Sequence, residues 1–154
     1  MDSTASIPET DLLTPTLLFR AGATLYGCHI SDAQEIIPLR RTTRLPGAPA
    51  FVRGLINVRG TIVTVLDLAV RFDAARAPTA DGSILLVRHR ERLVGVVVNE
   101  VVDVRPLAVE APDDDARESG AGSGASVMRG VATVDDAAVV ILDLDALITQ
   151  VLLA

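Results

Sequence analysis

The chain has 154 residues, of which 49% are apolar. It contains 14 arginines, no lysine and 20 acidic residues, which gives a formal net charge of −6. Mean hydropathy is high at +0.41, yet the longest stretch without charge, residues 21–31, is too short for a membrane-spanning helix of about 20 residues. One cysteine allows no internal disulfide, and three Phe and one Tyr are too few for a base-stacking platform. We therefore expect a cytoplasmic protein without direct membrane insertion or nucleic-acid binding.

An internal repeat organises the sequence. Residues 53–68 return 76 positions later as residues 129–144, with seven of 16 positions identical, including the opening Arg-Gly and the closing Leu-Asp-Leu. A second repeat, at an offset of 68, matches residues 17–27 with residues 85–95. Two matches in the same order indicate a duplication.

The duplication predicts one domain made of two similar halves. The first half covers about residues 15–72, and the second covers about residues 83–148 and is followed by the rest of a C-terminal helix. Residues 1–14 are expected to form an N-terminal extension to the domain at 15–154. Short apolar runs at close spacing predict a mainly β fold of small barrels with few helices.

In the first half, a short helix is predicted after a capping-box pattern at residues 31–34. Ala33, Ile36 and Ile37 share one helical face, and Pro38 ends the helix. A second helix of one or two turns is predicted at residues 68–72, after Asp67.

Residues 57–60, Asn-Val-Arg-Gly, fit a type I turn followed by a left-handed residue. Val58 and Arg59 then occupy the two central positions, where side chains normally face water. An apolar residue beside an arginine at a loop tip indicates a protein contact. The alternative, equally compatible with the spacing, is that Val58 folds back onto the barrel and Arg59 is only solvated.

In the second half, residues 83–87 and 93–98 predict a β-hairpin. Residues 74–81 before it are expected to be a mobile linker or surface loop, and the acidic, then glycine-rich residues 110–126 are expected to be disordered. A final amphipathic helix is predicted after Asp143, which is placed to cap it.

The sequence assembles no catalytic, metal or cofactor site. Cys28 and His29 are adjacent on a predicted strand, so their side chains point to opposite faces. With His89 as the only other histidine, a tetrahedral zinc site would need carboxylates to complete it. Asp67 and Asp143 occupy equivalent points of the repeat, which favours helix capping in both halves over an acid–base pair.

Residues 46–60, Pro-Gly-Ala-Pro-Ala-Phe-Val-Arg-Gly-Leu-Ile-Asn-Val-Arg-Gly, and the following Ile-Val-Thr-Val-Leu-Asp-Leu at 62–68 closely resemble the signature of the CheW family. These proteins are adaptors of bacterial chemosensory arrays. The resemblance extends to residues 26–27, 34–37, 93–98 and 141–144 and covers nearly the whole chain from about residue 15. It implies two five-stranded SH3-like β-barrels packed around a shared core, in agreement with the duplication.

The resemblance also implies a non-enzymatic function. Such adaptors connect the cytoplasmic tips of methyl-accepting chemoreceptors to the regulatory domain of a CheA-type histidine kinase, and are recruited to membrane-associated receptor arrays. The positions that match the family's receptor-facing set are Ala33, Glu35, Gly54, Val58 and Arg59. Gly95 matches a further position linked to kinase or receptor contact.

Two alternatives stay open at this stage. The same fold could serve a sister chemosensory pathway, such as pilus motility or gene regulation. From a different class, a small cytosolic enzyme could use His29 or His89 with a nearby aspartate, although no catalytic constellation supports it.

Overall fold

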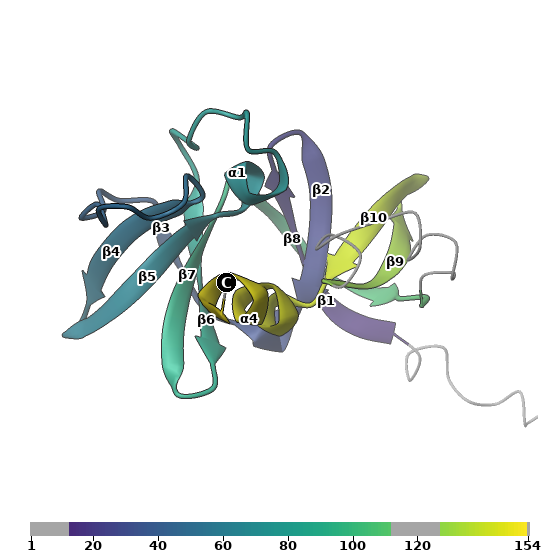
Figure 1. Ribbon diagram of the computed structural model, residues 1–154. Coiled ribbons are helices and arrows are strands. Elements are labelled where there is room, and N and C mark those ends of the chain that lie inside the picture. Colours follow the sequence, from purple (N-terminus) through teal and green to yellow (C-terminus); the bar gives the residue numbers. More distant parts are fainter. Residues whose placement is uncertain (1–12, 112–126, 154) are drawn as a thin grey trace, which may run out of the picture.

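The computed structural model describes residues 13–111 and 127–153, which form two five-stranded sheets and two α-helices (Figure 1). The elements in chain order are β1 (Leu13–Ala21), β2 (Thr24–His29), the 3-10 helix η3 (Ile30–Asp32), β3 (Ala33–Pro38), β4 (Val52–Val58), β5 (Thr61–Asp67), α1 (Leu68–Phe72), β6 (Ser83–His89), β7 (Arg92–Val98), β8 (Glu100–Ala108), β9 (Met128–Val134), β10 (Ala137–Leu142) and α4 (Leu144–Leu153). The predicted mainly β fold is confirmed, as are the hairpin of β6 and β7 and the helices α1 and α4. Of the predicted N-terminal extension, only Leu13 and Thr14 are described, as the start of β1, and most of the predicted disordered segment 110–126 lies outside the described residues.

Each sheet combines strands from both halves of the sequence. Sheet A has the order β8-β1-β2-β10-β9, and sheet B has the order β3-β6-β7-β5-β4. A hairpin from one half therefore completes a sheet whose other three strands come from the other half. The pairings that join the halves are β1 with β8, β2 with β10, β3 with β6, and β5 with β7. The two barrels thus do not coincide with the two halves of the chain.

Backbone bridges bring the outer strands of each sheet together. In sheet B, Thr43, in the segment after β3, pairs with Leu55 of β4. In sheet A, Glu110, after β8, pairs with Val131 of β9 in the same way. Each sheet therefore curls into a barrel, because its two outer strands are linked through the segment that follows one of them.

Period-two alternation along the strands produces three apolar clusters. Core A lies within sheet A and core B within sheet B, whereas the shared core lies between the sheets and includes residues of α1 and α4. Core A consists of Leu18, Leu107, Ala132, Val134, Val139 and Ile141. Core B consists of Ile56, Val58, Val63, Val65, Ile84, Leu86 and Val97. Figure 1 shows α4 lying between the two sheets, where Leu144, Leu147 and Ile148 join the shared core.

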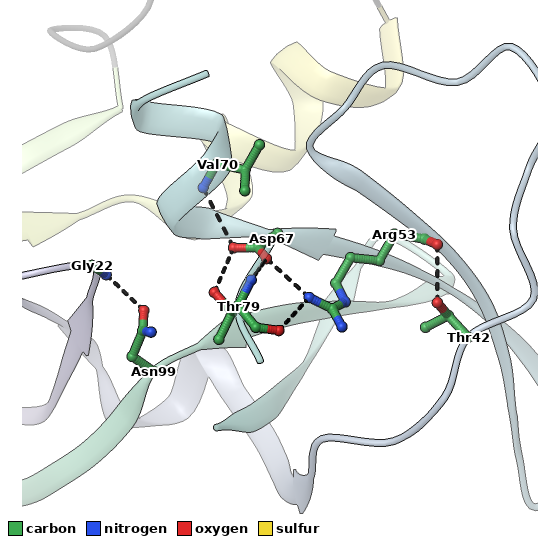
Figure 2. Close-up of polar contacts among 7 residues, drawn as sticks. All are labelled: Gly22, Thr42, Arg53, Asp67, Val70, Thr79 and Asn99. Carbon is green, nitrogen blue, oxygen red and sulfur yellow. Dashed lines mark hydrogen bonds and ion pairs between the residues drawn. The ribbon is translucent and has the colours of Figure 1, made fainter. Parts of the chain in front are cut away.

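The buried carboxylate of Asp67 organises the connection from β5 to β6 (Figure 2). It accepts hydrogen bonds from the Val70 N–H at the start of α1 (3.4 Å), and from the N–H (2.8 Å) and hydroxyl (3.0 Å) of Thr79. The Arg53 guanidinium lies 3.1 Å from Asp67 and also donates to the Thr79 carbonyl at 2.7 Å. The segment at 74–81 was predicted to be mobile, but it is anchored at Thr79, which is buried. The small and polar composition of this segment gives no local sign that Thr79 is buried, because the residues that bind Thr79 lie far from it in sequence.

The second half repeats this arrangement in a more exposed form. Arg129 lies 3.5 Å from Asp143, with side chains 43% and 34% exposed, against 19% and 1% for Arg53 and Asp67. Asp143 also accepts a hydrogen bond from the Ala146 N–H at 3.0 Å, at the start of α4. The capping role predicted for both aspartates is confirmed.

The helix predicted at residues 31–37 is wrong. Residues Ile30–Asp32 form a single 3-10 turn, and Ala33–Pro38 form strand β3 against β6. The His29 ring accepts a hydrogen bond from the Ser31 N–H at 3.1 Å, so the cap lies two residues before the predicted one. The β-branched pair Ile36 and Ile37 suits the edge of a sheet better than a helix, and pairing with β6 decides the outcome.

Replacing Asp67 by Asn tests the buried ion pair while keeping a side chain that can still cap α1. Breaking a buried pair leaves the Arg53 charge without its partner, so we expect the free energy of unfolding to fall by about 3 kcal/mol. The matched control is Asp143→Asn, whose exposed pair with Arg129 should cost less than about 1 kcal/mol. Urea unfolding followed by circular dichroism measures both. Equal losses for the two variants would contradict the role assigned to the burial of Asp67.

Candidate functional site

The turn between β4 and β5 is a two-residue hairpin loop. Arg59 has φ 48° and Gly60 has φ 89°, and two positive φ values in such a loop identify a type I′ turn. The predicted type I turn over residues 57–60 is therefore wrong, because a primed turn matches the twist of the flanking strands better. Val58 is the last residue of β4, is 4% exposed and belongs to core B. The alternative is confirmed for Val58, whose side chain packs onto the barrel and is not at the surface, but Arg59 is not only solvated, because it pairs with Glu35.

Arg59 has an unusual backbone for its residue type. Non-glycine residues seldom adopt φ near +50°, and Asn, Asp or Gly are preferred at this position of a type I′ turn. Its side chain is nevertheless 69% exposed, so no packing of the guanidinium into a core explains why arginine stands here. The Asn57 side chain stabilises the turn by accepting a hydrogen bond from the Gly60 N–H at 2.8 Å.

Glu35 on β3 forms a two-pronged ion pair with Arg59. One guanidinium nitrogen lies 2.5 Å from Glu35 Oε1 and the other lies 3.3 Å from Oε2. The hydrogen bonds from Arg59 lower the pKa of Glu35 from its usual value, and the same contact raises the pKa of Arg59. The pair is therefore fully formed above the ordinary pKa of a glutamate and is lost in acid, as the pH falls through the lowered pKa of Glu35. Because both groups face solvent, salt weakens the pair.

This ion pair also bridges the two outer strands of sheet B, since Glu35 lies on β3 and Arg59 directly follows β4. Sheet A has a counterpart with the charges reversed. There, Arg105 of β8 lies 3.7 Å from Asp135, the first residue of the turn after β9. Asp135 and Arg59 are equivalent in the repeat, and Asp135 also has a positive φ of 50°. Part of the role of the Glu35–Arg59 pair is thus to help close the barrel.

Gly54 lies beneath the surface, at a point where two backbones come close together. It has φ +134°, and a Cβ there would lie 2.1 Å from the Thr43 carbonyl oxygen. Its repeat equivalent, Gly130, is in the same situation, with a Cβ position 2.5 Å from the Glu110 carbonyl oxygen. Both glycines precede the residue that makes the barrel-closing bridge. The structure therefore gives Gly54 a role in shaping the β4–β5 hairpin.

Gly95 is buried on the inner side of sheet B. A Cβ there would lie 2.9 Å from Ile84 Cγ2 and 3.3 Å from Val65 Cγ2. Its equivalent in the first half, Gly27, has the same constraint, with Ile141 Cδ1 at 2.9 Å. Gly95 can therefore influence a binding surface through the packing of its two neighbours in the sheet, β5 and β6.

Of the residues selected from the sequence, the structure brings Glu35 and Arg59 together at the surface. Ala33 is half-buried on β3 and packs against the shared core. The other three, Gly54, Val58 and Gly95, are buried. Four of the six residues thus support the surface or lie beside it.

Sequence reasoning did not select Ile62, the most exposed large apolar residue in the described part of the chain at 60%. It lies on β5 directly opposite Asn57 and borders a hollow of about 190 Å³ that Arg92 and Leu152 also line. The signal was present in the alternation along β5, where Val63 and Val65 point into core B and Ile62 points outward. We call Glu35, Arg59 and Ile62 the turn surface. Ile62 follows Arg59 by three positions on the same hairpin, and an exposed apolar residue close in sequence to an exposed ion pair is typical of a protein contact.

The side chains considered for catalysis or metal binding are buried or bonded to neighbouring side chains. Cys28 is fully buried in the shared core, and burial raises the pKa of its thiol to about 12, with a smaller contribution from Asp32. His89 is 5% exposed, with Nδ1 2.7 Å from Asp145 Oδ1 and Nε2 3.5 Å from the Thr149 hydroxyl, both on α4. Within residues 13–111 and 127–153, no group of three His, Cys, Asp or Glu side chains could hold a metal ion. The same ranges contain no helix that is both long and apolar enough to span a membrane.

Comparison with known proteins gives a consistent picture. The family model described as CheW-like domain matches residues 15–152. The chain is 29% identical to "Chemotaxis protein CheW" of Klebsiella aerogenes over 135 residues, covering 87% of this chain and 81% of that protein. It is 28% identical to "Probable chemotaxis protein CheW" of Rhizobium etli, again over 135 residues, covering 87% and 86%. It also matches "Protein PilI" of Pseudomonas aeruginosa at 28% identity, over 60% of this chain and 52% of that protein.

The fold is similar to a solved structure of the same kind. The crystal structure of the scaffolding protein TtCheW from Thermoanaerobacter tengcongensis superposes with a TM-score of 0.73 at 28% identity, covering 86% of this chain and 85% of that chain. The family model matches residues 15–152, and the two CheW relatives and the structural neighbour each cover 86–87% of the chain. The chain therefore belongs to the CheW-like domain family.

Proposed function

We propose that this protein is a non-enzymatic cytoplasmic adaptor that couples chemoreceptors to a CheA-type histidine kinase. The observation that carries the proposal is the turn surface, where Arg59, in a left-handed backbone, pairs with Glu35 of β3, and where the same hairpin bears the exposed Ile62. Strained residues persist where the surrounding structure enforces them, and they are concentrated at functional sites. Membership of the CheW-like family, whose relatives are named as chemotaxis proteins, supports the assignment.

The turn surface has the chemistry needed to bind a protein. Arginine has five N–H donors, and the two contacts to Glu35 leave others for carbonyl or carboxylate acceptors on a receptor tip. Glu35 also restricts where the guanidinium points, which lowers the entropy lost on binding. Ile62 adds exposed apolar area on the same hairpin as Arg59. Gly54 and Val58 are buried in the β4–β5 hairpin and help to fix its shape, on which the positions of Arg59 and Ile62 depend.

A sister pathway is the second candidate, supported by the match to PilI of Pseudomonas aeruginosa. In that case the fold and the turn surface would be the same, and the partners would be the receptors and kinase of a pilus-motility or gene-regulation system. The enzyme alternative has less support. His29 caps the 3-10 helix, and His89 has both ring nitrogens directed at side chains of α4.

The direct test is reconstitution with each CheA-type kinase encoded in the same genome. We expect the protein to sediment with one kinase and the matching receptor fragment, and to raise the autophosphorylation of that kinase over the rate without adaptor. The kinase that responds identifies the pathway. Absence of a measurable complex with every such kinase would overturn the adaptor proposal.

Arg59→Asn should separate binding from stability. Asn tolerates a left-handed backbone better than Arg, and this gain should offset the small loss of the exposed pair with Glu35, so the melting temperature should stay close to that of the parent. Loss of the charged donor should weaken receptor binding by about tenfold or more. Calorimetry of unfolding and of binding to the receptor fragment measures the two effects. The matched control is Arg90→Asn, which relieves the same kind of strain (φ 58°) in the β6–β7 turn and should leave binding intact. Equal binding by the two variants would show that Arg59 is not a contact.

Reversal of the Glu35–Arg59 pair distinguishes a partner contact from barrel closure. The single variants Glu35→Arg and Arg59→Glu each place like charges together, whereas the double variant restores an ion pair of opposite polarity, as in the Arg105–Asp135 pair of sheet A. We expect the double variant to regain the melting temperature of the parent but not its receptor binding. Recovery of binding in the double variant would assign the pair a purely structural role.

A further inference from the structure

Neither half of this chain contains a complete sheet. Within the first half, the described strand pairings are β1 with β2 and β4 with β5, and within the second half they are β6 with β7 and β9 with β10. Strands β3 and β8 pair only with strands of the opposite half among the described residues. An isolated two-stranded hairpin is marginally stable in water, so each half needs the strands of the other half to fold.

We propose that two copies of this chain can exchange halves to form an intertwined dimer. The first half of one copy would combine with the second half of the other, and the four pairings that join the halves would form between copies instead of within one. All cores and both barrels would be kept, and only the linker would change its path. This inference goes beyond the adaptor function and does not depend on it.

The linker between the halves is the hinge that determines whether the halves pair within one chain or between two chains. It runs for ten residues, from the end of α1 at Phe72 to the start of β6 at Ser83. Its first part makes a turn in which the Arg76 N–H donates to the Asp73 carbonyl at 3.0 Å. From Thr79 onward it is fixed to the barrel, by Asp67 and Arg53 and then by the bond from the Leu39 N–H to the Gly82 carbonyl at 3.1 Å. Residues 73–78 are thus the part that can be repositioned without loss of these contacts.

The length of the hinge sets the balance between monomer and dimer. A short flexible linker holds the second half at a millimolar effective concentration, which favours closure within one chain. A linker too short to span the sites reduces that concentration to near zero, and pairing with a second copy then becomes the available route. Exchange between folded molecules requires all four pairings to break, so the proportions are fixed while the chain folds.

The test deletes residues 74–78 from the full chain. The matched control replaces the same five residues by Gly and Ser, which keeps the length of the linker. The deletion variant and its control both carry Cys28→Ala, which removes the native thiol, and the pair Arg20→Cys and Glu100→Cys. Arg20 of β1 and Glu100 of β8 are exposed, directly paired residues from opposite halves of the chain. A disulfide between these positions joins two chains in an exchanged dimer and stays within one chain in a monomer or in an ordinary side-by-side dimer.

We expect the deletion variant to have the mass of a dimer by light scattering and to run as a covalent dimer in denaturing gels without reductant. The length-matched control should be monomeric with an intrachain disulfide. A monomeric deletion variant with a native circular dichroism spectrum, or a dimer whose disulfides are intrachain, would overturn the proposal.

A second measurement decides the matter if the deletion variant does not fold. The parent chain carrying the same cysteine pair is refolded at low micromolar and at near-millimolar concentration, then diluted and analysed in the same way. We expect an interchain-linked dimer fraction that grows with the concentration during refolding. Monomer alone at the higher concentration would refute the exchange of halves.

Discussion

The pairing of strands across the two halves of the chain is the constraint on which the rest of the structure depends. Because β1–β2 and β6–β7 are inserted into sheets built mainly by the opposite half, the two barrels are held against each other and enclose the shared core. The hairpin that carries the turn surface belongs to the first half, yet β5 lies beside β7 of the second half, with Val65 opposite Gly95. The candidate binding surface is therefore a product of both halves.

Comparison of the two halves of the chain distinguishes features that support the barrels from features that belong to one barrel alone. Three features occur in both halves: the Arg–Asp pair at the start of a helix, the glycine at a close backbone approach, and the primed turn that joins β4 to β5 and β9 to β10. Features present twice serve the barrel, whichever partner it binds. The turn surface is not repeated, because Asp135 and Ala138 stand where the first half has Arg59 and Ile62. The two barrels thus present turns of opposite charge on the same scaffold.

Much of the fold could be predicted from the sequence, because its signals are local. The β6–β7 hairpin, the C-terminal helix and the capping by Asp67 and Asp143 all follow from short patterns. The errors arose where distant residues decide: pairing with β6 turned residues 33–38 into a strand, and strand twist selected the primed turn that buries Val58. Residues 35 and 59 were both selected, but their contact and its reversed counterpart in sheet A required the closed barrels. The assignment of strands to sheets has no local signal, since either half could in principle have closed on itself.

The burial of Gly95 against Val65 has a consequence for genetics. A side chain at that position would press on Ile84 of β6 and Val65 of β5, and β5 begins directly after the turn that bears Arg59. A screen for loss of the proposed adaptor function would therefore recover substitutions from both halves of the chain, and many of them would lie away from the turn surface. The positions of such substitutions alone would overestimate the size of the binding surface. Only variants that keep the parental melting temperature would identify residues of the candidate contact.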